Sequence, residues 1–177
     1  KDLNQNITSG EWRFANLATT GLHPPGSAFK IVTAVAALAE GKTDPDEEIF
    51  DPGYHPSAPT LVCHRRGGHG YVNLERALEV SCNTYFYEMG RRLGVDTLAE
   101  YCRALGLGMK TGIDLGGENY GTVPSTEWKA KAYGEGRVAQ PEFLFSEHMM
   151  VAMGQAFHRY TPIQMASVTQ AIANGGV

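Results

Sequence analysis

Ser27 and Lys30 stand three positions apart at the point where a Pro-Pro-Gly turn runs into an apolar segment. The apolar run after them predicts a helix over residues 27–40. Because side chains at i and i+3 share a helix face, we expect the serine hydroxyl and the lysine amine within hydrogen-bonding distance. This arrangement is typical of a serine nucleophile with a lysine base. The alternative is an N-cap serine and a surface lysine, which the apolar surroundings of Lys30 disfavour.

Ser81 and Asn83 form a second pair of candidate residues, between two predicted helices. A serine and an asparagine two positions apart can point into one cleft, where the serine relays a proton and the asparagine holds an amide or Lys30. The alternative is an ordinary turn, because both residue types favour turns.

Four further residues offer metal ligands: two thiols, an imidazole and a carboxylate, a set that suits tetrahedral Zn²⁺. They are Asp51, Cys63, His69 and Cys82. Their spacing lacks the close-set ligand pairs of known zinc sites, so spacing alone favours two ordinary thiols and a loop histidine. His64 is a rival imidazole, and Cys102 is interpreted as a core residue.

Composition limits the function classes. The chain has 177 residues, 42% of them hydrophobic and 19% charged, which is ordinary for a globular domain. The formal net charge is −4 and there is no basic run, which argues against nucleic-acid binding. No apolar stretch reaches the ~18 residues that a transmembrane helix needs. The first residue is Lys, so we expect a piece of a longer protein.

The elements that position these residues are mostly helices. Periodicity and caps predict helices over 74–80 after Asn73, 84–93, 97–105 after Asp96, 146–153, and 162–173 after a capping box at Thr161. Residues 1–20 are expected to be a poorly structured lead-in, and 42–72 and 106–145 are predicted as long loops with few strand signals. The expected core includes Tyr85, Phe86, Met89, Met149, Met150 and Met153. Trp128 is expected to pack against the helices, and Asp114 to cap or tie a loop.

Taken together, the two motifs are more specific than either alone. S-x-x-K followed about fifty residues later by S-x-N resembles the penicillin-recognising acyltransferases. Longer strings occur in the matching order: Gly21–Lys30, Asp51–Tyr54, Gly68–Gly70, Leu78–Tyr87, Thr111–Leu115, Glu127–Lys129, Gly154–Gln155 and Thr161–Met165. From about residue 21 to residue 177 the chain resembles the class B penicillin-binding proteins, in particular the elongation-type penicillin-binding protein 2.

The resemblance implies a D,D-transpeptidase that crosslinks peptidoglycan stem peptides. Ser27 would attack the D-Ala-D-Ala carbonyl with Lys30 as base, Ser81 would pass a proton to the leaving amine, and Asn83 would orient Lys30. β-Lactams would acylate Ser27. The implied fold is mainly α: one partial domain over 1–177, the helical part of the α/β transpeptidase fold, without most of its five-stranded sheet.

The family's third motif, Lys-Ser/Thr-Gly on a sheet strand, is expected downstream of Val177. The Lys110-Thr111-Gly112 string lies in a segment that the resemblance places in a structural loop. Because the third motif helps to form the oxyanion hole, the chain as given is predicted to be a poor or inactive enzyme.

The resemblance also shifts the balance towards a structural Zn²⁺ held by Asp51, Cys63, His69 and Cys82. It implies a parent protein anchored in the bacterial cytoplasmic membrane with this region on the extracytoplasmic side. The implied partners are stem peptides, β-lactams, a lipid-linked glycan polymerase and shape-determining proteins. The competing hypotheses are a non-catalytic zinc-stabilised scaffold and a β-lactam-sensing module.

Overall fold

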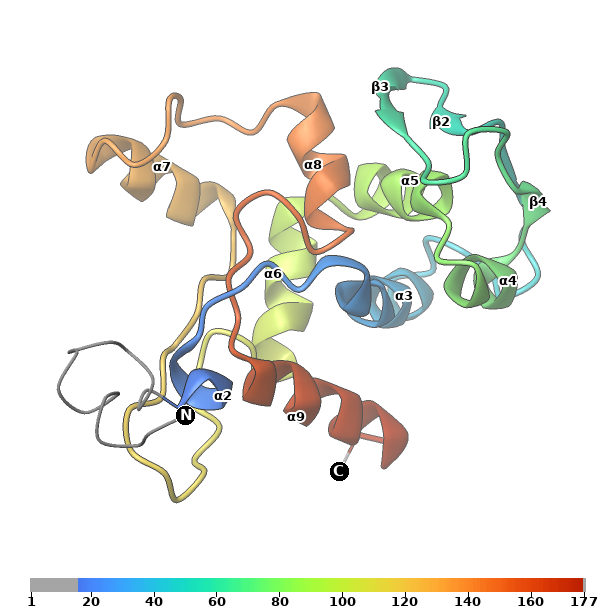
Figure 1. Cartoon of the computed structure of the whole chain (residues 1–177). Helices are drawn as coiled ribbons and strands as arrows, with labels where there is room; N and C mark the ends of the chain where they lie inside the picture. Colours follow the sequence, from blue (N-terminus) through green and yellow to red (C-terminus); the bar gives the residue numbers. More distant parts are fainter. Residues whose placement is uncertain (1–15, 177) are drawn as a thin grey trace, which may run out of the picture.

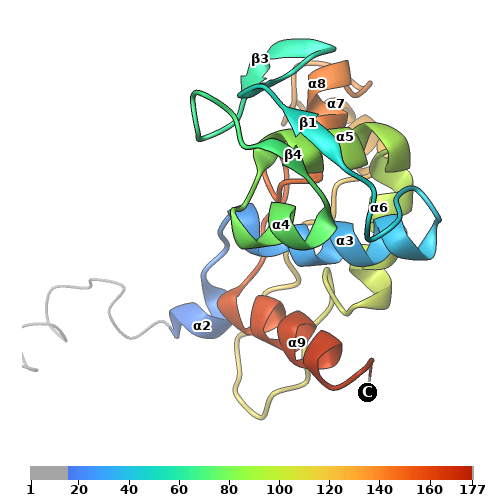
Figure 2. The ribbon, with the colours of Figure 1, turned by 90° about the vertical axis from the view of Figure 1, so that its right-hand side faces the viewer.

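The computed structural model describes residues 16–176, so most of the predicted lead-in, residues 1–15, lies outside the described residues. Four short strands, all within residues 49–72, lie at one end of the molecule. The last helix lies at the opposite end (Figures 1 and 2). The elements are α2 (Leu17–Thr20), a 3-10 turn η1 (Gly26–Phe29), α3 (Lys30–Ala39), β1 (Ile49–Asp51), β2 (Tyr54–His55), β3 (Ala58–Val62), β4 (Gly70–Val72), α4 (Leu74–Glu79), α5 (Asn83–Leu93), α6 (Val95–Ala104), α7 (Thr126–Gly134), α8 (Phe145–Val151) and α9 (Pro162–Ala173).

Helix α5 is the centre of the core and packs against α3, α4, α6 and α8. It buries Tyr85, Phe86 and Met89 completely, as the sequence predicts. Helix α8 approaches α5 closely at Gly90, where a Cβ would lie 2.7 Å from the His148 carbonyl oxygen. On the α8 side Met149 and Met153 are buried, whereas Met150 is half-buried and packs at the edge of the core.

The predicted caps of α4 and α9 are confirmed. The Asn73 side chain accepts a 3.0 Å hydrogen bond from the Arg76 amide, and Thr161 and Gln164 form the capping box. The predicted cap at Asp96 is wrong. Helix α6 begins at Val95, and the Asp96 carboxylate accepts from the Thr126 amide at 2.8 Å and its hydroxyl at 2.9 Å, so it joins α6 to the start of α7.

Three predictions of irregular structure are wrong in part. Residues 42–72 contain two antiparallel pairs, β1 with β4 and β2 with β3, in registers that include Asp51 opposite Gly70 and His55 opposite Ala58. Residues 106–145 contain α7, which begins after a Ser125 cap. In the lead-in, Leu17–Thr20 is a short helix capped by Asn16. The strand signals are weak because the strands are only 2–5 residues long.

The two loop residues singled out from the sequence have different outcomes. Trp128 is half-buried and its ring lies 5.2 Å from the Phe157 ring, as expected for a packing role. Asp114 is exposed, and the carboxylate that ties its loop is Glu118, which accepts from the Thr111 amide at 2.8 Å. Residues 16–176 form two two-stranded sheets and no five-stranded sheet. Their helices are too short or too polar to cross a membrane.

Candidate active site

Lys30 is the first residue of α3, and its side chain is almost completely buried, with 2% of the residue exposed. Its amine Nζ donates three hydrogen bonds: to the Ser81 carbonyl at 2.7 Å, the Ser81 hydroxyl at 2.9 Å and Asn83 Oδ1 at 2.9 Å. The Phe86 ring lies 5.4 Å away. Three donors are all that an ammonium has, so the charged form is fully satisfied by the S-x-N turn.

Burial makes the Lys30 ammonium easier to deprotonate than that of a free lysine, although its three hydrogen bonds satisfy the charged form. Burial lowers the pKa of Lys30 from 10.5 to about 8, and the nearby Cys82 and Cys63 oppose this shift. A buried amine with its pKa near the pH of use is suited to accept a proton.

Ser27 lies in the 3-10 turn η1 and is exposed, two residues before the buried Phe29–Lys30 pair begins. The predicted hydrogen bond between the Ser27 hydroxyl and Lys30 is absent among the hydrogen bonds of residues 16–176, where those of the amine all run to Ser81 and Asn83. The reason lies in tertiary packing: the Lys30 amine is directed to the turn before α5, where the Ser81 carbonyl, the Ser81 hydroxyl and Asn83 take its three donors. The Ser27 hydroxyl is therefore accessible, and the Lys30 amine, one turn further along the chain, is held by Ser81 and Asn83.

The turn that carries Ser81 and Asn83 joins α4 to α5. Ser81 has φ +53°, a left-handed conformation that is uncommon for a residue other than glycine. In this conformation both its carbonyl and its hydroxyl contact the Lys30 amine. The turn, which is the alternative interpretation of this motif, therefore also makes the predicted contact with Lys30, and the uncommon backbone conformation is located at that contact.

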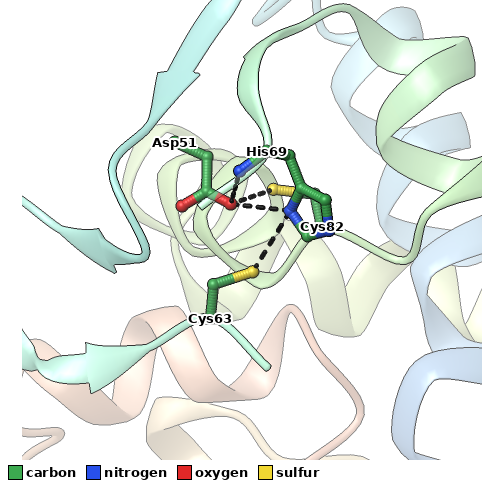
Figure 3. A group of neighbouring side chains, drawn as sticks. All are labelled: Asp51, Cys63, His69 and Cys82. Carbon is green, nitrogen blue, oxygen red and sulfur yellow. Dashed lines mark hydrogen bonds and ion pairs between the residues drawn. The ribbon is translucent and has the colours of Figure 1, made fainter. Parts of the chain in front are cut away.

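The four predicted metal ligands come together from four chain segments, and their ligand atoms all lie within 4.8 Å of one another. Figure 3 shows the four side chains pointing towards a common centre. Asp51 ends β1, Cys63 follows β3, His69 precedes β4 and Cys82 precedes α5. His69 Nδ1 lies 2.7 Å from Asp51 Oδ2 and 3.5 Å from Cys63 Sγ, and Cys82 Sγ lies 3.3 Å from the same carboxylate oxygen.

The Asp51 carboxylate is held in its ionised form. Burial by itself would raise the pKa of Asp51, but hydrogen bonds from the Thr84 hydroxyl at 2.6 Å, the Gly53 amide at 2.8 Å and the imidazole hold this pKa well below its usual range. Burial raises the pKa of the Cys82 thiol. Thr84 is a contributor that sequence reasoning missed. Its only signal is its place directly after the S-x-N motif.

The rival residues fall outside this cluster. His64 is exposed, and its Nδ1 lies 4.0 Å from Cys63 Sγ. Cys102 is fully buried in the core, where its sulfur accepts a 3.6 Å contact from the Tyr160 hydroxyl. Lys110-Thr111-Gly112 is a loop whose Thr111 and Gly112 amides bind Glu118. The string therefore has the structural role that the sequence analysis expects.

Comparison with known proteins decides the family. The family described as Penicillin binding protein transpeptidase domain matches residues 1–177. The chain belongs to this transpeptidase family. Among its curated relatives, the peptidoglycan D,D-transpeptidase MrdA of Escherichia coli is 34% identical over 180 residues. The match covers 100% of this chain and 28% of the relative. MrdA of Acinetobacter baumannii is 35% identical over 164 residues, covering 91% and 24%.

Solved structures agree with the transpeptidase fold. PBP2 of Pseudomonas aeruginosa, in complex with WCK 5153, superposes with a TM-score of 0.83 at 34% identity, over 97% of this chain and 39% of that one. PBP2 of Helicobacter pylori, in complex with MreC, gives 0.86 at 27% identity, over 99% and 32%. The mainly helical character and the fold predicted from the sequence are confirmed. The chain spans about a quarter of the length of the curated relatives it matches.

Proposed function

We propose that this chain carries the acylating centre of a peptidoglycan D,D-transpeptidase, with Ser27 as its nucleophile. The observation that carries the proposal is the buried Lys30 amine, held by Ser81 and Asn83 one turn after an exposed serine. Membership of the transpeptidase family and the D,D-transpeptidase relatives support the same chemistry.

In this proposal the reaction is divided among four residues. Ser27 Oγ attacks the carbonyl carbon of the D-Ala-D-Ala bond, and its proton passes to the neutral Lys30 amine. The C–N bond then breaks, and Ser81 passes a proton from Lys30 to the leaving D-Ala nitrogen. The product is an ester on Ser27, which the amine of a second stem peptide attacks to form the crosslink and return the serine. Asn83 holds Lys30 in place by its 2.9 Å hydrogen bond.

β-Lactams give the direct test. When Ser27 opens the β-lactam ring, the leaving nitrogen stays covalently attached to the acyl group, so the whole drug adds to the mass of the chain. Intact mass after prolonged incubation with a penicillin should show one slowly formed adduct on the chain, as expected for a poor enzyme, and none on Ser27→Ala. An adduct that persists in the variant would contradict Ser27 as nucleophile. No adduct on the natural sequence would contradict an autonomous acylating centre and favour the non-catalytic scaffold or a site that needs further sequence, such as the third motif.

A structural Zn²⁺ is the second part of the proposal. Its support is the donor set of two thiols, one imidazole and one carboxylate, converging from four segments within 4.8 Å. Asp51 lies at the end of β1, and Cys82 lies between Ser81 and Asn83, so their contact joins the strand region to the S-x-N turn. A bound zinc ion would supply a cross-link between them. Zinc content and thermal stability of the purified chain test this assignment.

The partners and location are proposed from the relatives. A relative of 27% identity was solved as PBP2 with MreC, and one of 29% identity belongs to a peptidoglycan synthase complex that coordinates polymerization and crosslinking. We infer that the parent of this chain works with a shape-determining protein and a glycan polymerase, outside the cytoplasm where stem peptides are crosslinked, and is anchored in the membrane. Co-purification of the parent protein with both partner classes would test this.

A further inference from the structure

The turn that follows α8, residues 152–154, packs directly on the turn that carries Ser27. The Gly26 amide donates a 3.0 Å hydrogen bond to the Gly154 carbonyl. Seven residues further on, the buried Thr33 hydroxyl donates a 2.7 Å hydrogen bond to the Ala152 carbonyl. The Gly154 and Ala152 carbonyls of this turn thus accept hydrogen bonds from one residue before the Ser27–Lys30 motif and from one residue after it.

Gly154 makes the closest of these contacts. It is buried, with φ +66°, and a Cβ at this position would lie 2.5 Å from the Gly26 carbonyl oxygen and 2.5 Å from Phe29 Cβ. Real Cβ atoms do not approach other atoms this closely, and one of the two contacts is with backbone. The turn Gly26–Phe29, which carries Ser27 and is called the nucleophile turn, therefore keeps its position only while residue 154 lacks a side chain.

The segment after Gly154 supports the other side of the same turn. Phe29 is fully buried and its ring lies 4.3 Å from the His158 ring. His158 is fixed in turn, because its Nε2 donates to the Val151 carbonyl at 3.1 Å and its Nδ1 lies 2.7 Å from the Tyr160 hydroxyl. Tyr160 also pairs with His23 through two backbone hydrogen bonds. The turn of Ser27 thus rests on a buried, hydrogen-bonded surface.

We propose that Gly154 is a positioning residue for Ser27. It fixes the position of the nucleophile turn relative to the turn after α8, through the hydrogen bond from the Gly26 amide and through direct contact with Phe29. The functional part rests on the proposed role of Ser27, whereas the positional part does not. Chemistry at Ser27 would depend on this contact because small displacements of a nucleophile slow its attack by large factors.

Gly154→Ala tests the proposal, and Gly41→Ala is its matched control. Gly41 has φ +59°, and no atom lies within 4 Å of the position that a Cβ would take there, so both variants carry the same backbone penalty but only one collides with the nucleophile turn. In Gly154→Ala, hydrogen exchange at the Gly26 amide should accelerate at least about tenfold, and acylation by penicillin should slow about tenfold or more. Gly41→Ala should leave both unchanged.

A second pair of variants serves if Gly154→Ala does not fold. Thr33→Val keeps the shape but loses the hydrogen bond to Ala152, whereas Thr33→Ser keeps the hydroxyl. Faster Gly26 exchange in Thr33→Val alone supports the positioning role of the turn. Equal exchange and equal acylation in both members of each pair overturns it. A chain in which exchange responds as expected but Ser27 is never acylated retains the positional claim and loses the proposed function.

Discussion

Lys30 and Asn83 lie 53 positions apart in the sequence, yet each is the first residue of its helix and the two side chains meet in a 2.9 Å hydrogen bond. The Lys30 amine therefore lies near the N-termini of α3 and α5, which pack against each other. Helix N-termini carry partial positive charge and disfavour an ammonium. Burial acts in the same direction and lowers the pKa of Lys30 to about 8, so the neutral amine that a general base requires is more populated near neutral pH than in a free lysine.

The acylation rate is expected to rise with pH and to level off above about pH 8. The pKa of Lys30 is lowered to about 8, so the amine is protonated below this value and neutral above it. The measurement is the rate of penicillin adduct formation as a function of pH, corrected for spontaneous hydrolysis of the drug. A rate that does not change through this range would remove Lys30 as the base.

Replacing Asn83 with Asp should move this pH profile upwards. The substitution keeps the shape but places a carboxylate about where the amide oxygen lies, 2.9 Å from the Lys30 amine. An opposite charge at this distance favours the ammonium and raises a pKa by roughly 1–3 units. At neutral pH the variant should therefore acylate more slowly and recover at higher pH. Asn83→Ala is the control: it loses the hydrogen bond without adding charge, so its defect should not be recovered by raising the pH.

Chelation should lower the melting temperature of the zinc-loaded chain. The cluster ties β1, β3 and the start of α5, and a metal bound only to the folded state stabilises that state. His69→Ala should lose zinc and no longer respond to chelator. His64→Ala removes the exposed neighbouring imidazole and should behave like the natural sequence. Stoichiometric zinc in His69→Ala, or a melt that chelation leaves unchanged, would count against the site.

The contacts of Lys30 with Ser81 and Asn83 and the convergence of the four candidate ligands agree with the sequence analysis, whereas the predicted Ser27–Lys30 hydrogen bond is absent among residues 16–176. Ser27 with Lys30, and Ser81 with Asn83, can be found because the spacing within each pair is local. Asp51, Cys63, His69 and Cys82 are selected by the family resemblance, because the chain has 19 acidic residues and six histidines and their spacing alone does not single these four out. The contacts of Thr84 with Asp51, and of the Ser81 carbonyl with Lys30, depend on tertiary packing and leave no local signal.

There are physical reasons why the sequence pattern does not indicate β3 and α7. The strand β3 exposes most of its residues without alternation, so it has no period of two to detect. Helix α7 has no apolar stripe, because one of its two buried side chains is Lys129. That ammonium is bound to the Glu147 carboxylate and the Glu142 carbonyl and lies 4.6 Å from the Phe143 ring. A buried, paired lysine looks like a surface residue in sequence.

Gly90→Ala should destabilise the fold, whereas Gly134→Ala should not. Both glycines are helical, and alanine is the better helix former by about 1 kcal/mol. At Gly134 no atom lies within 4 Å of a Cβ, so the substitution is expected to stabilise. At Gly90 the Cβ would lie 2.7 Å from the His148 carbonyl oxygen and 2.8 Å from Ala152 Cβ, and overpacking of this kind costs about 1–3 kcal/mol. Denaturant unfolding measures both, and equal effects would mean that α5 and α8 can separate freely.

His158 should make the fold sensitive to acid. Burial lowers its pKa to about 3 from 6.5, and the hydrogen bond to the Val151 carbonyl only partly opposes this. Between these values the unfolded chain binds a proton that the folded chain does not. The stability is therefore fully present above about pH 6.5 and falls by up to about 1.4 kcal/mol per unit as the pH decreases towards 3.

Substitution isolates this histidine from the other acid-sensitive groups. The free energy of unfolding of His158→Gln should depend less steeply on pH between about 6.5 and 3 than that of the natural sequence. Parallel slopes for His158→Gln and the natural sequence would show that His158 takes up its proton in the folded state. The acid lability would then arise elsewhere, and the surface behind Phe29 would be less rigid than its hydrogen bonds indicate.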